Sequence, residues 1–514
     1  MKPVKIFLTF LLILILIAMI AYVFPKKGIK VLPGITLNFP SWDQLFSQDT
    51  QTYKDISRIV QKNVPIDTIA PVIQEDYADQ VVEEDTLPIA DTSKKMSRQN
   101  LNKRSRKPQS APHNHLTYPD NNPEVLYPFF SSLEKLPHNN QLIRILHYGD
   151  SQIEGDRISS YLRDQLQKKF GGAGIGLFPI VLPHNTHIAL NHAISNSWER
   201  FTILDTKETN FRHNRFGALL SFSRFSPYYS YYKEEVYEAW ITLGSSPLAF
   251  NRTSAFTICK ILYGYNEKPF IVKMNYKDKT AEADMVAPSD DLQMLKWDIP
   301  QSVEQFTLGF QGTHSPNIYG LALDGKQGIA LDNIPLRGSS GTEFTKSDTA
   351  FIRTMLDKIN VKLIIMYFGV NVVPVIRDNY DYYEKQFYQQ LRFFKSIDRD
   401  MSVIVMGVSD MSRKVGGDYQ SYPNIPGIRD AQKKAAFRAG CAFWDTYSAM
   451  GGKNSMPSWV FADPPLARKD FTHFTYKGSV VIAKMFYKTL IKEYQKFKKY
   501  SEQKQMLTEK DKGK

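Results

Sequence analysis

Cysteine is nearly absent from this chain, since only Cys259 and Cys441 occur among 514 residues. Two cysteines cannot supply a scaffold held by several disulfides or a zinc domain ligated by clustered thiolates. The histidines do not indicate a metal site either, because they are scattered and lack metal-ligand spacing on a defined element. The residues considered are His184, His187, His192 and His213. The sequence therefore predicts neither a disulfide framework nor a metal centre.

Long apolar runs are equally scarce, and only residues 6–24 (IFLTFLLILILIAMIAYVF) have membrane length. A helix of this length spans about 28 Å, close to a bilayer core of roughly 30 Å. No small-residue cleavage pattern follows the run and no cysteine there could be lipidated, so an uncleaved signal anchor is expected. We expect a single-pass protein of the cytoplasmic membrane. Residues 1–5 would be cytoplasmic, and the remainder periplasmic or otherwise extracytoplasmic.

The net charge of +13 at first suggests an acidic partner such as nucleic acid. Most of this charge lies outside the body of the chain. Residues 1–30 carry +5, residues 93–107 carry +7 and residues 492–514 carry +4, whereas residues 31–92 carry −8. The body, residues 108–491, is left with +5. Charge runs of this kind are usually solvated, so no nucleic-acid partner is expected.

The two ends of the chain show little apolar periodicity. Residues 25–120 combine an acidic stretch, a basic stretch and scattered prolines, which predicts a disordered linker. Residues 494–514 are lysine-rich and are predicted to be a charged flexible tail.

Between these ends, apolar runs that suit buried strands alternate with helical patterns. The strands are expected at 142–148, 329–334, 361–368, 402–408 and 441–445. The helices are expected at 156–170, 346–359, 378–397, 427–439 and 475–492. This alternation predicts an α/β domain with a parallel sheet.

Residues 195–325 interrupt the alternation with short alternating or apolar runs separated by turn signals. That pattern is typical of an antiparallel β-sandwich. The sandwich would be inserted after the first strand of the α/β domain, which then consists of residues 121–194 and 326–493. The two ends of an inserted module should lie close together.

Two short motifs could carry chemistry. Ser151 follows Gly149 and Asp150 at the end of the first predicted strand, where α/β sheets expose ligand-binding groups and where a serine can act as a nucleophile. Asp470 and His473 lie on a loop before the last predicted helix and could supply a base with its orienting carboxylate. Each motif alone could be an ordinary turn with a helix cap, and Thr475 is expected to cap that last helix.

Further residues could stabilise an oxyanion at the same edge of the sheet. Asn371 ends the strand at 361–368, and Gly338 follows the strand at 329–334. The Asn371 amide, the Gly338 N–H and the Ser151 N–H could act as hydrogen-bond donors there. Each could equally be an ordinary strand-end turn, and Gly341 is an alternative to Gly338.

Together, the blocks around Ser151, Gly338, Asn371 and His473 occur in the order found in the SGNH (GDSL-type) hydrolases. The chain resembles this family over roughly 123–193 and 326–493. The resemblance implies a three-layer α/β/α, flavodoxin-like domain that needs no metal or organic cofactor. The family's common Gly-Asp-Ser-Leu is Gly-Asp-Ser-Gln here, and we expect Gln152 to change little. An ordinary α/β-hydrolase is not indicated, because no Gly-x-Ser-x-Gly surrounds the serine.

Residue roles follow from the same resemblance. Ser151 would be the nucleophile, His473 the base and Asp470 the residue that orients it. The oxyanion hole would consist of Ser151 N–H, Gly338 N–H and the Asn371 side chain.

The expected context also suggests a substrate. An anchored enzyme with an inserted sandwich resembles bacterial O-acetylesterases of cell-envelope polysaccharide or peptidoglycan. We therefore expect an acetylated glycan as substrate and a membrane-bound acyltransferase as a candidate partner. Two alternatives stay open: a glycan O-acetyltransferase with the same triad, and a non-catalytic glycan-binding protein of the envelope.

Aromatic residues could contact such a glycan. The candidates are Tyr228, Tyr229, Tyr231, Tyr232 and nearby Trp240 in the sandwich, and Trp459 before the histidine loop. The aromatic residues of the sandwich could instead belong to its core, and Trp459 could instead belong to a structural loop.

The glycine-rich run 172–176 follows a predicted helix rather than a strand, which is the wrong context for a dinucleotide-binding loop. A turn is therefore predicted there.

Overall fold

The computed structural model describes residues 54–63, most of 114–512 and parts of 9–37. Within 114–512 the description leaves out 184–186, 206–210, 212, 229–233, 277–278 and 301–302. The chain divides into two units, Met1–Tyr53 and Lys54–Lys514, which are considered separately.

The first unit contains helical residues between 9 and 22 and the antiparallel hairpin β1 (Ile29–Leu32) and β2 (Ile35–Leu37). The anchor expected over 6–24 lies partly outside the described residues. Where the chain is described, no helix combines the length and apolar character needed to cross a membrane. The anchor stays a prediction.

A mixed six-stranded sheet forms the centre of the second unit, in the order β16-β4-β17-β18-β21-β3. Its members are β16 (Gly328–Pro335), β4 (Leu142–Gly149), β17 (Val361–Tyr367), β18 (Ser402–Met406), β21 (Ala442–Trp444) and β3 (Leu116–Thr117). The first five are parallel and β3 pairs antiparallel at the edge. Counted along the chain, the parallel strands follow the flavodoxin-like order 2-1-3-4-5, whose switch point lies between β4 and β17.

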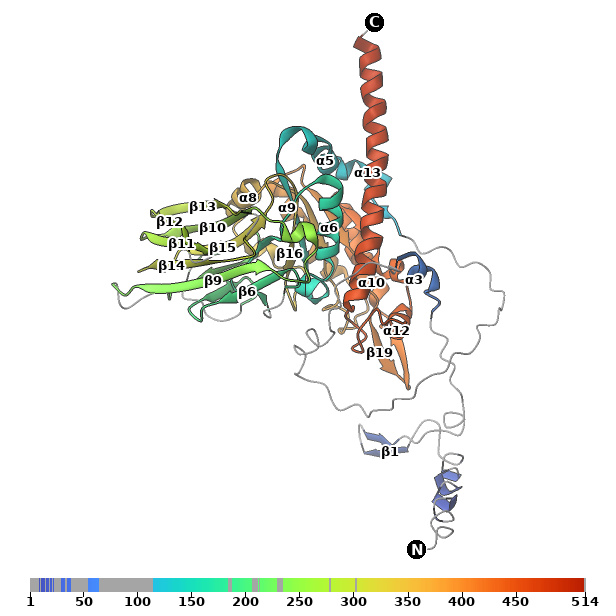
Figure 1. Cartoon of the computed structure of the whole chain (residues 1–514). Coiled ribbons are helices and arrows are strands. Elements are labelled where there is room, and N and C mark those ends of the chain that lie inside the picture. The colour runs from blue at the N-terminus through green and yellow to red at the C-terminus, as the bar shows by residue number, and fades with distance from the viewer. Residues whose placement is uncertain are drawn as a thin grey trace. The chain divides into compact units, whose positions relative to one another are not determined.

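Helices cover both faces of this sheet, because apolar residues along its strands point alternately to either side. In β4, Ile143 and Ile145 belong to one core, whereas Leu146 and Tyr148 belong to the other. The first core includes α5 (Tyr127–Asn139), α6 (Ser159–Phe170) and α13 (Tyr476–Lys512). The second includes α8 (Thr349–Lys358), α9 (Asp381–Ile397) and α10 (Ile425–Arg438). The predicted three-layer α/β/α arrangement is confirmed (Figure 1).

Smaller elements connect these layers. The helical ones are η1 (Pro119–Asn121), η2 (Pro123–Leu126), η3 (Ser151–Asp156), α7 (Asn251–Ser254), η5 (Phe344–Lys346), α11 (Thr446–Met450) and α12 (Ser455–Val460). The hairpin β19 (Ser412–Val415) and β20 (Asp418–Ser421) follows β18.

The inserted module consists of two antiparallel sheets, as the sequence predicts (Figure 1). One sheet has the order β13-β10-β15-β8-β7, and β5 also pairs with β15. Its strands are β13 (Ser289–Asp298), β10 (Ile258–Asn266), β15 (Asn317–Asp324), β8 (Ser221–Arg224), β7 (Glu199–Thr202) and β5 (Gly176–Phe178). The other is β12 (Lys279–Val286), β11 (Phe270–Tyr276), β14 (Gln305–Gly312), β9 (Tyr237–Ser245) and β6 (Leu190–Ile194). A shared apolar core joins the sheets and includes Ile241, Ile261 and Leu308.

The module begins earlier than the predicted boundary at 195. Strand β5 pairs with β15, with Gly176 opposite Leu323, and β6 pairs with β9. Residues from about 176 onward therefore already belong to the sandwich. The pairing of Gly176 with Leu323 also brings the entry and exit of the module together, as expected for an insertion.

The two predicted flexible ends also need correction. Helix α3 (Ser57–Asn63) lies inside the predicted linker, yet Ile56 and Ile59 are buried in the same core as α13. Strand β3 extends the sheet from within that linker. The predicted tail at 494–514 continues α13 as far as Lys512. Tyr494 and Phe497 pack into the core, which supports this continuation.

Candidate active site

The turn that carries Ser151 follows β4 without a spacer. A Cβ on Gly149 would lie 2.8 Å from the Tyr367 carbonyl oxygen on β17, so only glycine permits this close approach. The Asp150 side chain accepts the Gln152 N–H at 3.0 Å and caps η3. Ser151 therefore lies at the carboxyl edge of the sheet, beside the switch point between β4 and β17.

The loop from Asp470 to His473 is shaped by its own aspartate. The Asp470 Oδ1 atom accepts the N–H groups of Thr472 at 2.9 Å and His473 at 3.0 Å. Phe471 has φ of +55°, an uncommon conformation for a bulky residue. As predicted, Thr475 caps α13, since its Oγ1 accepts the Gly478 N–H at 3.1 Å.

The structure brings the three predicted catalytic side chains together. Ser151 Oγ lies 2.8 Å from His473 Nε2, although the two residues are 322 positions apart. His473 Nδ1 lies 2.7 Å from Asp470 Oδ2. A hydroxyl that donates to an imidazole, which in turn donates to a carboxylate, can lose its proton while it attacks a carbonyl carbon.

The electrostatics of Asp470 suit this arrangement. Burial alone would raise the pKa of the carboxyl group. Hydrogen bonds from the His473 side chain and from the His473 and Thr472 N–H groups outweigh burial and hold the pKa of Asp470 below its ordinary value. The carboxylate is therefore ionised at neutral pH and can stabilise a protonated imidazole.

Gly338 lies in the turn after β16, next to the nucleophile. The Leu336 N–H donates to the Gly149 carbonyl at 2.7 Å, which fixes the turn beside Ser151. Across the described residues, the N–H groups of Gly338 and Ser151 have no protein acceptor. The N–H of Gly341 differs, because it donates to Ser339 Oγ at 2.8 Å. Of the two glycines, Gly338 is the one whose N–H can donate to a ligand.

Asn371 reaches the same turn from the end of β17. Its Nδ2 donates to the Ser339 carbonyl at 2.9 Å, which leaves the second amide hydrogen for another acceptor. The predicted donors thus come from three neighbouring strand ends: Ser151 after β4, Gly338 after β16 and Asn371 after β17.

Asp150 joins two of these strand ends, a role that sequence reasoning missed. Its Oδ2 accepts the N–H groups of Gly369 at 3.1 Å and Val370 at 3.3 Å. Burial raises the pKa of Asp150 to about 6, although the hydrogen bonds from Gln152, Val370 and Gly369 oppose this rise. The only signal in the sequence was the position of Asp150 between Gly149 and Ser151.

Comparisons with known proteins agree with this geometry at the level of the fold. No family model matches the sequence, and no curated protein matches it. A solved structure of a peptidoglycan O-acetylesterase matches with a TM-score of 0.57 and 18% identity, covering 72% of this chain and 96% of that chain. The chain has the fold of the SGNH hydrolases.

Two further solved structures match over about a third of this chain. One is an acetyl xylan esterase with 13% identity and a TM-score of 0.25, covering 31% of this chain and 80% of that chain. The other is a carbohydrate esterase family 3 protein from Talaromyces cellulolyticus with 16% identity and a TM-score of 0.23, covering 32% of this chain and 72% of that chain.

The structure does not support the predicted glycan contacts at Trp459 and Tyr228. Trp459 is fully buried, donates from Nε1 to the Met450 carbonyl at 3.0 Å and packs against Phe474, so it supports the base loop from behind. Tyr228 packs against Phe211 and lies under the Arg224 guanidinium, rather than forming an open stacking platform. Tyr229, Tyr231 and Tyr232 lie outside the described residues.

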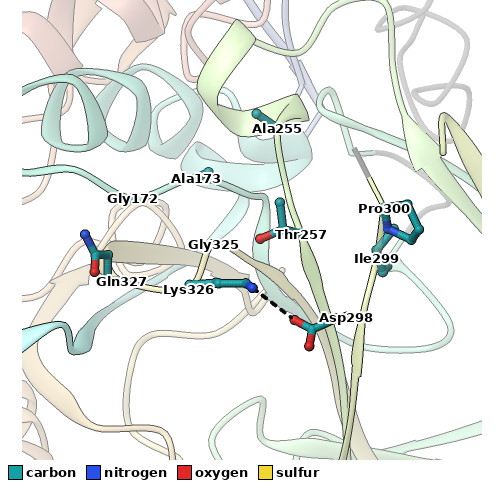
Figure 2. A pocket seen from close by; sticks show the side chains of 10 residues that line it. All are labelled: Gly172, Ala173, Ala255, Thr257, Asp298, Ile299, Pro300, Gly325, Lys326 and Gln327. Carbon is teal, nitrogen blue, oxygen red and sulfur yellow. Dashed lines mark ion pairs between the residues drawn. The ribbon is translucent and has the colours of Figure 1, made fainter. Parts of the chain in front are cut away.

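A surface depression of about 770 Å³ lies away from this site (Figure 2). It is lined by Gly172, Lys326 and Asp298 among others, at the amino end of β16, whereas Ser151 lies at the carboxyl edge. The glycine run there is a packing turn, as predicted. Cβ atoms on Gly172 and Gly174 would lie 2.4 Å and 2.2 Å from backbone carbonyl oxygens.

Across the described residues, no three His, Cys, Asp or Glu side chains converge as around a metal ion.

Proposed function

We propose that this protein is a serine esterase that removes O-acetyl groups from a cell-envelope glycan. The observation that carries the proposal is the hydrogen-bonded chain from Ser151 through His473 to Asp470 at the switch point of the sheet. The fold shared with a peptidoglycan O-acetylesterase supports the choice of an acetylated glycan.

In the first half-reaction, Ser151 Oγ attacks the ester carbonyl carbon while its proton passes to His473 Nε2. Asp470 stabilises the imidazolium that forms. The negative charge on the carbonyl oxygen is held by the N–H groups of Ser151 and Gly338 and by the Asn371 amide, each donor being worth about 3–4 kcal/mol. His473 then protonates the departing sugar oxygen, which leaves an acetyl group on Ser151.

In the second half-reaction, a water molecule gives its proton to His473 and attacks the acetyl carbon. The tetrahedral intermediate collapses, Ser151 Oγ recovers the proton, and acetate is released. Every step uses side chains or backbone groups of this chain.

The exposure of the site suits an ester carried on a polymer. The His473 and Asp470 side chains are 27% and 43% exposed, so the base is not enclosed at the bottom of a deep cavity. A long chain can therefore present an acetyl group to Ser151 without leaving solvent. We further propose that residues 6–24 anchor the enzyme in the cytoplasmic membrane, which would hold it close to envelope glycan.

The substrate class is tested by acetate release. We expect the full chain to release acetate from O-acetylated peptidoglycan, and the Ser151→Ala variant to release none. Hydrolysis of 4-nitrophenyl acetate without acetate release from O-acetylated peptidoglycan or O-acetylated polysaccharide would contradict the proposed substrate. Failure on all of these compounds would contradict the esterase itself.

A further inference from the structure

The two carbonyl groups on either side of His473 are held by side chains from the nucleophile turn. Gln152 Nε2 donates to the Thr472 carbonyl at 2.7 Å, and Arg157 Nη1 donates to the Phe474 carbonyl at 3.2 Å. We infer that Gln152 and Arg157 are positioning residues that hold His473 within hydrogen-bond distance of Ser151. This inference rests on the proposed function, since it assigns both residues to the esterase mechanism.

The planar guanidinium of Arg157 donates to three backbone carbonyl groups. Besides the Phe474 carbonyl, its Nη2 donates to the Ser151 carbonyl at 2.7 Å and its Nε donates to the Glu154 carbonyl at 2.8 Å. The guanidinium fork has a fixed geometry, so these bonds set the distance between the nucleophile and the residue after the base. A lysine keeps the charge but cannot span all three acceptors.

Gln152 acts on the other side of the base through its amide hydrogens. The Thr472 carbonyl can only accept, so the Gln152 atom facing it must be the Nε2 donor. The same nitrogen donates to Ser409 Oγ at 3.2 Å, beyond the end of β18, and the side chain is buried. A leucine, the family's common residue at this position, could make neither bond. The expectation that Gln152 changes little did not anticipate these contacts.

The base loop needs such support. Phe471 lies in the left-handed region, which costs of the order of 1–3 kcal/mol unless surrounding contacts compensate. The loop also meets Ser151 only through tertiary contacts, since the two segments are far apart in sequence. A misplacement of 1 Å between reacting groups can reduce a rate by about 100-fold, so small shifts of His473 should be visible in kcat.

The test compares Gln152→Leu, Gln152→Glu and Arg157→Lys with the wild-type full chain. Gln386→Leu and Arg392→Lys on the exposed side of α9 are matched controls. We expect Gln152→Leu and Arg157→Lys to lower kcat on 4-nitrophenyl acetate by about 10- to 100-fold, with KM within about threefold. Gln152→Glu should lower kcat further, because its carboxylate would face the Thr472 carbonyl oxygen. The controls should match the wild type.

A second readout does not depend on turnover. The Nδ1 proton of His473, shared with Asp470, should give a low-field proton resonance that is absent from His473→Ala. This resonance should shift or broaden in Gln152→Leu, Gln152→Glu and Arg157→Lys, but not in the controls. Wild-type kcat and an unchanged resonance in these variants would overturn the inference, as would the absence of the resonance from the wild type. A wild-type chain without esterase activity would instead remove the proposed function, and the resonance would still decide whether the two residues position His473.

Discussion

Several side chains of this site hold backbone groups in place. Asp150 accepts three N–H groups from two strand ends, and Asn371 bonds to the Ser339 carbonyl. These bonds place the proposed donors before a substrate arrives. Donors fixed in advance need no reorganisation during the reaction, which is why they stabilise a transition state more than water does.

Replacing Asn371 tests the oxyanion role at this scale. Asn371→Ala should lower kcat on an acetyl ester by about 100- to 1,000-fold and leave KM nearly unchanged, because the substrate accepts a bond from Asn371 only as the oxyanion develops. Steady-state kinetics beside the exposed Asn191→Ala control would show this. A rise in KM with kcat unchanged would assign Asn371 to ground-state binding instead.

His147 provides a prediction about pH and stability. It is fully buried on β4, with Nδ1 2.8 Å from Ser159 Oγ, and burial lowers its pKa to about 3. An unfolded histidine gains a proton near pH 6.5, whereas folded His147 remains neutral, so acidification below pH 6.5 favours the unfolded chain. Relative to His147→Gln, the wild-type free energy of unfolding should fall by about 2 kcal/mol between pH 7 and pH 5.

Urea unfolding of both proteins at the two pH values measures this difference directly. The comparison with the variant removes the opposing effect of buried aspartates such as Asp332, whose pKa burial raises to about 6. A difference that stays constant over this pH range would show that His147 takes up protons equally in the folded and unfolded chain, which would contradict a lowered pKa in the folded state.

At the scale of elements, the hairpin β19–β20 supports the base loop. The Ser412 N–H donates to the Phe471 carbonyl at 3.0 Å, and the Tyr419 ring stacks on the Phe471 ring at a centroid distance of 3.6 Å. The hairpin therefore helps to hold the loop in its left-handed conformation at Phe471.

Truncating the stacked ring should disturb catalysis without removing a catalytic group. Tyr419→Ala should lower kcat by about 3- to 10-fold, because the lost stacking, worth about 0.5–1.5 kcal/mol beyond buried area, lets the loop move. Tyr382→Ala on the exposed side of α9 is the control, compared by kinetics and thermal unfolding. Equal kcat values in both variants would show that the hairpin does not position the base.

The sequence predicted most of these elements, because long apolar runs have a clear period. It predicted all the parallel strands and an antiparallel sandwich over 195–325. It missed β5 and β6, which precede that range, and the mostly polar hairpin β19–β20. The helix expected from 156 begins only at Ser159, because Gly155 and Asp156 have positive φ. The Gly416-Gly417 pair was the one available hairpin signal.

At the scale of the whole molecule, a buried ion network joins the α/β domain to the inserted sandwich. Arg144 on β4 bonds to Asp332 on β16 and to Asp324, the last residue of β15, at distances of 2.5 and 2.6 Å. Lys260 on β10 reaches the same Asp324 at 2.9 Å. Removing one partner would leave a buried charge unpaired. The network therefore favours this one arrangement of the two sheets over others.

The catalytic residues could be predicted from the sequence, whereas the buried ion network could not. Ser151, Asp470 and His473 could be found because short motifs at strand ends carry a recognisable chemistry and order. Arg144 and Asp324 lie 180 positions apart inside apolar strands, with no local pattern to connect them. The same holds for Arg157, whose acceptors include a carbonyl 317 positions away. Contacts of this kind depend on tertiary structure and leave no trace in local periodicity.

The most direct test of the central claim is turnover of 4-nitrophenyl acetate by the full chain and by Ser151→Ala. Ser501→Ala, a serine on α13 away from the site, serves as the control. If Ser151 is the nucleophile, its loss should reduce kcat by at least about 1,000-fold while the melting temperature and the control activity stay at wild-type values. A folded Ser151→Ala protein that turns over the ester at the wild-type rate would contradict the account.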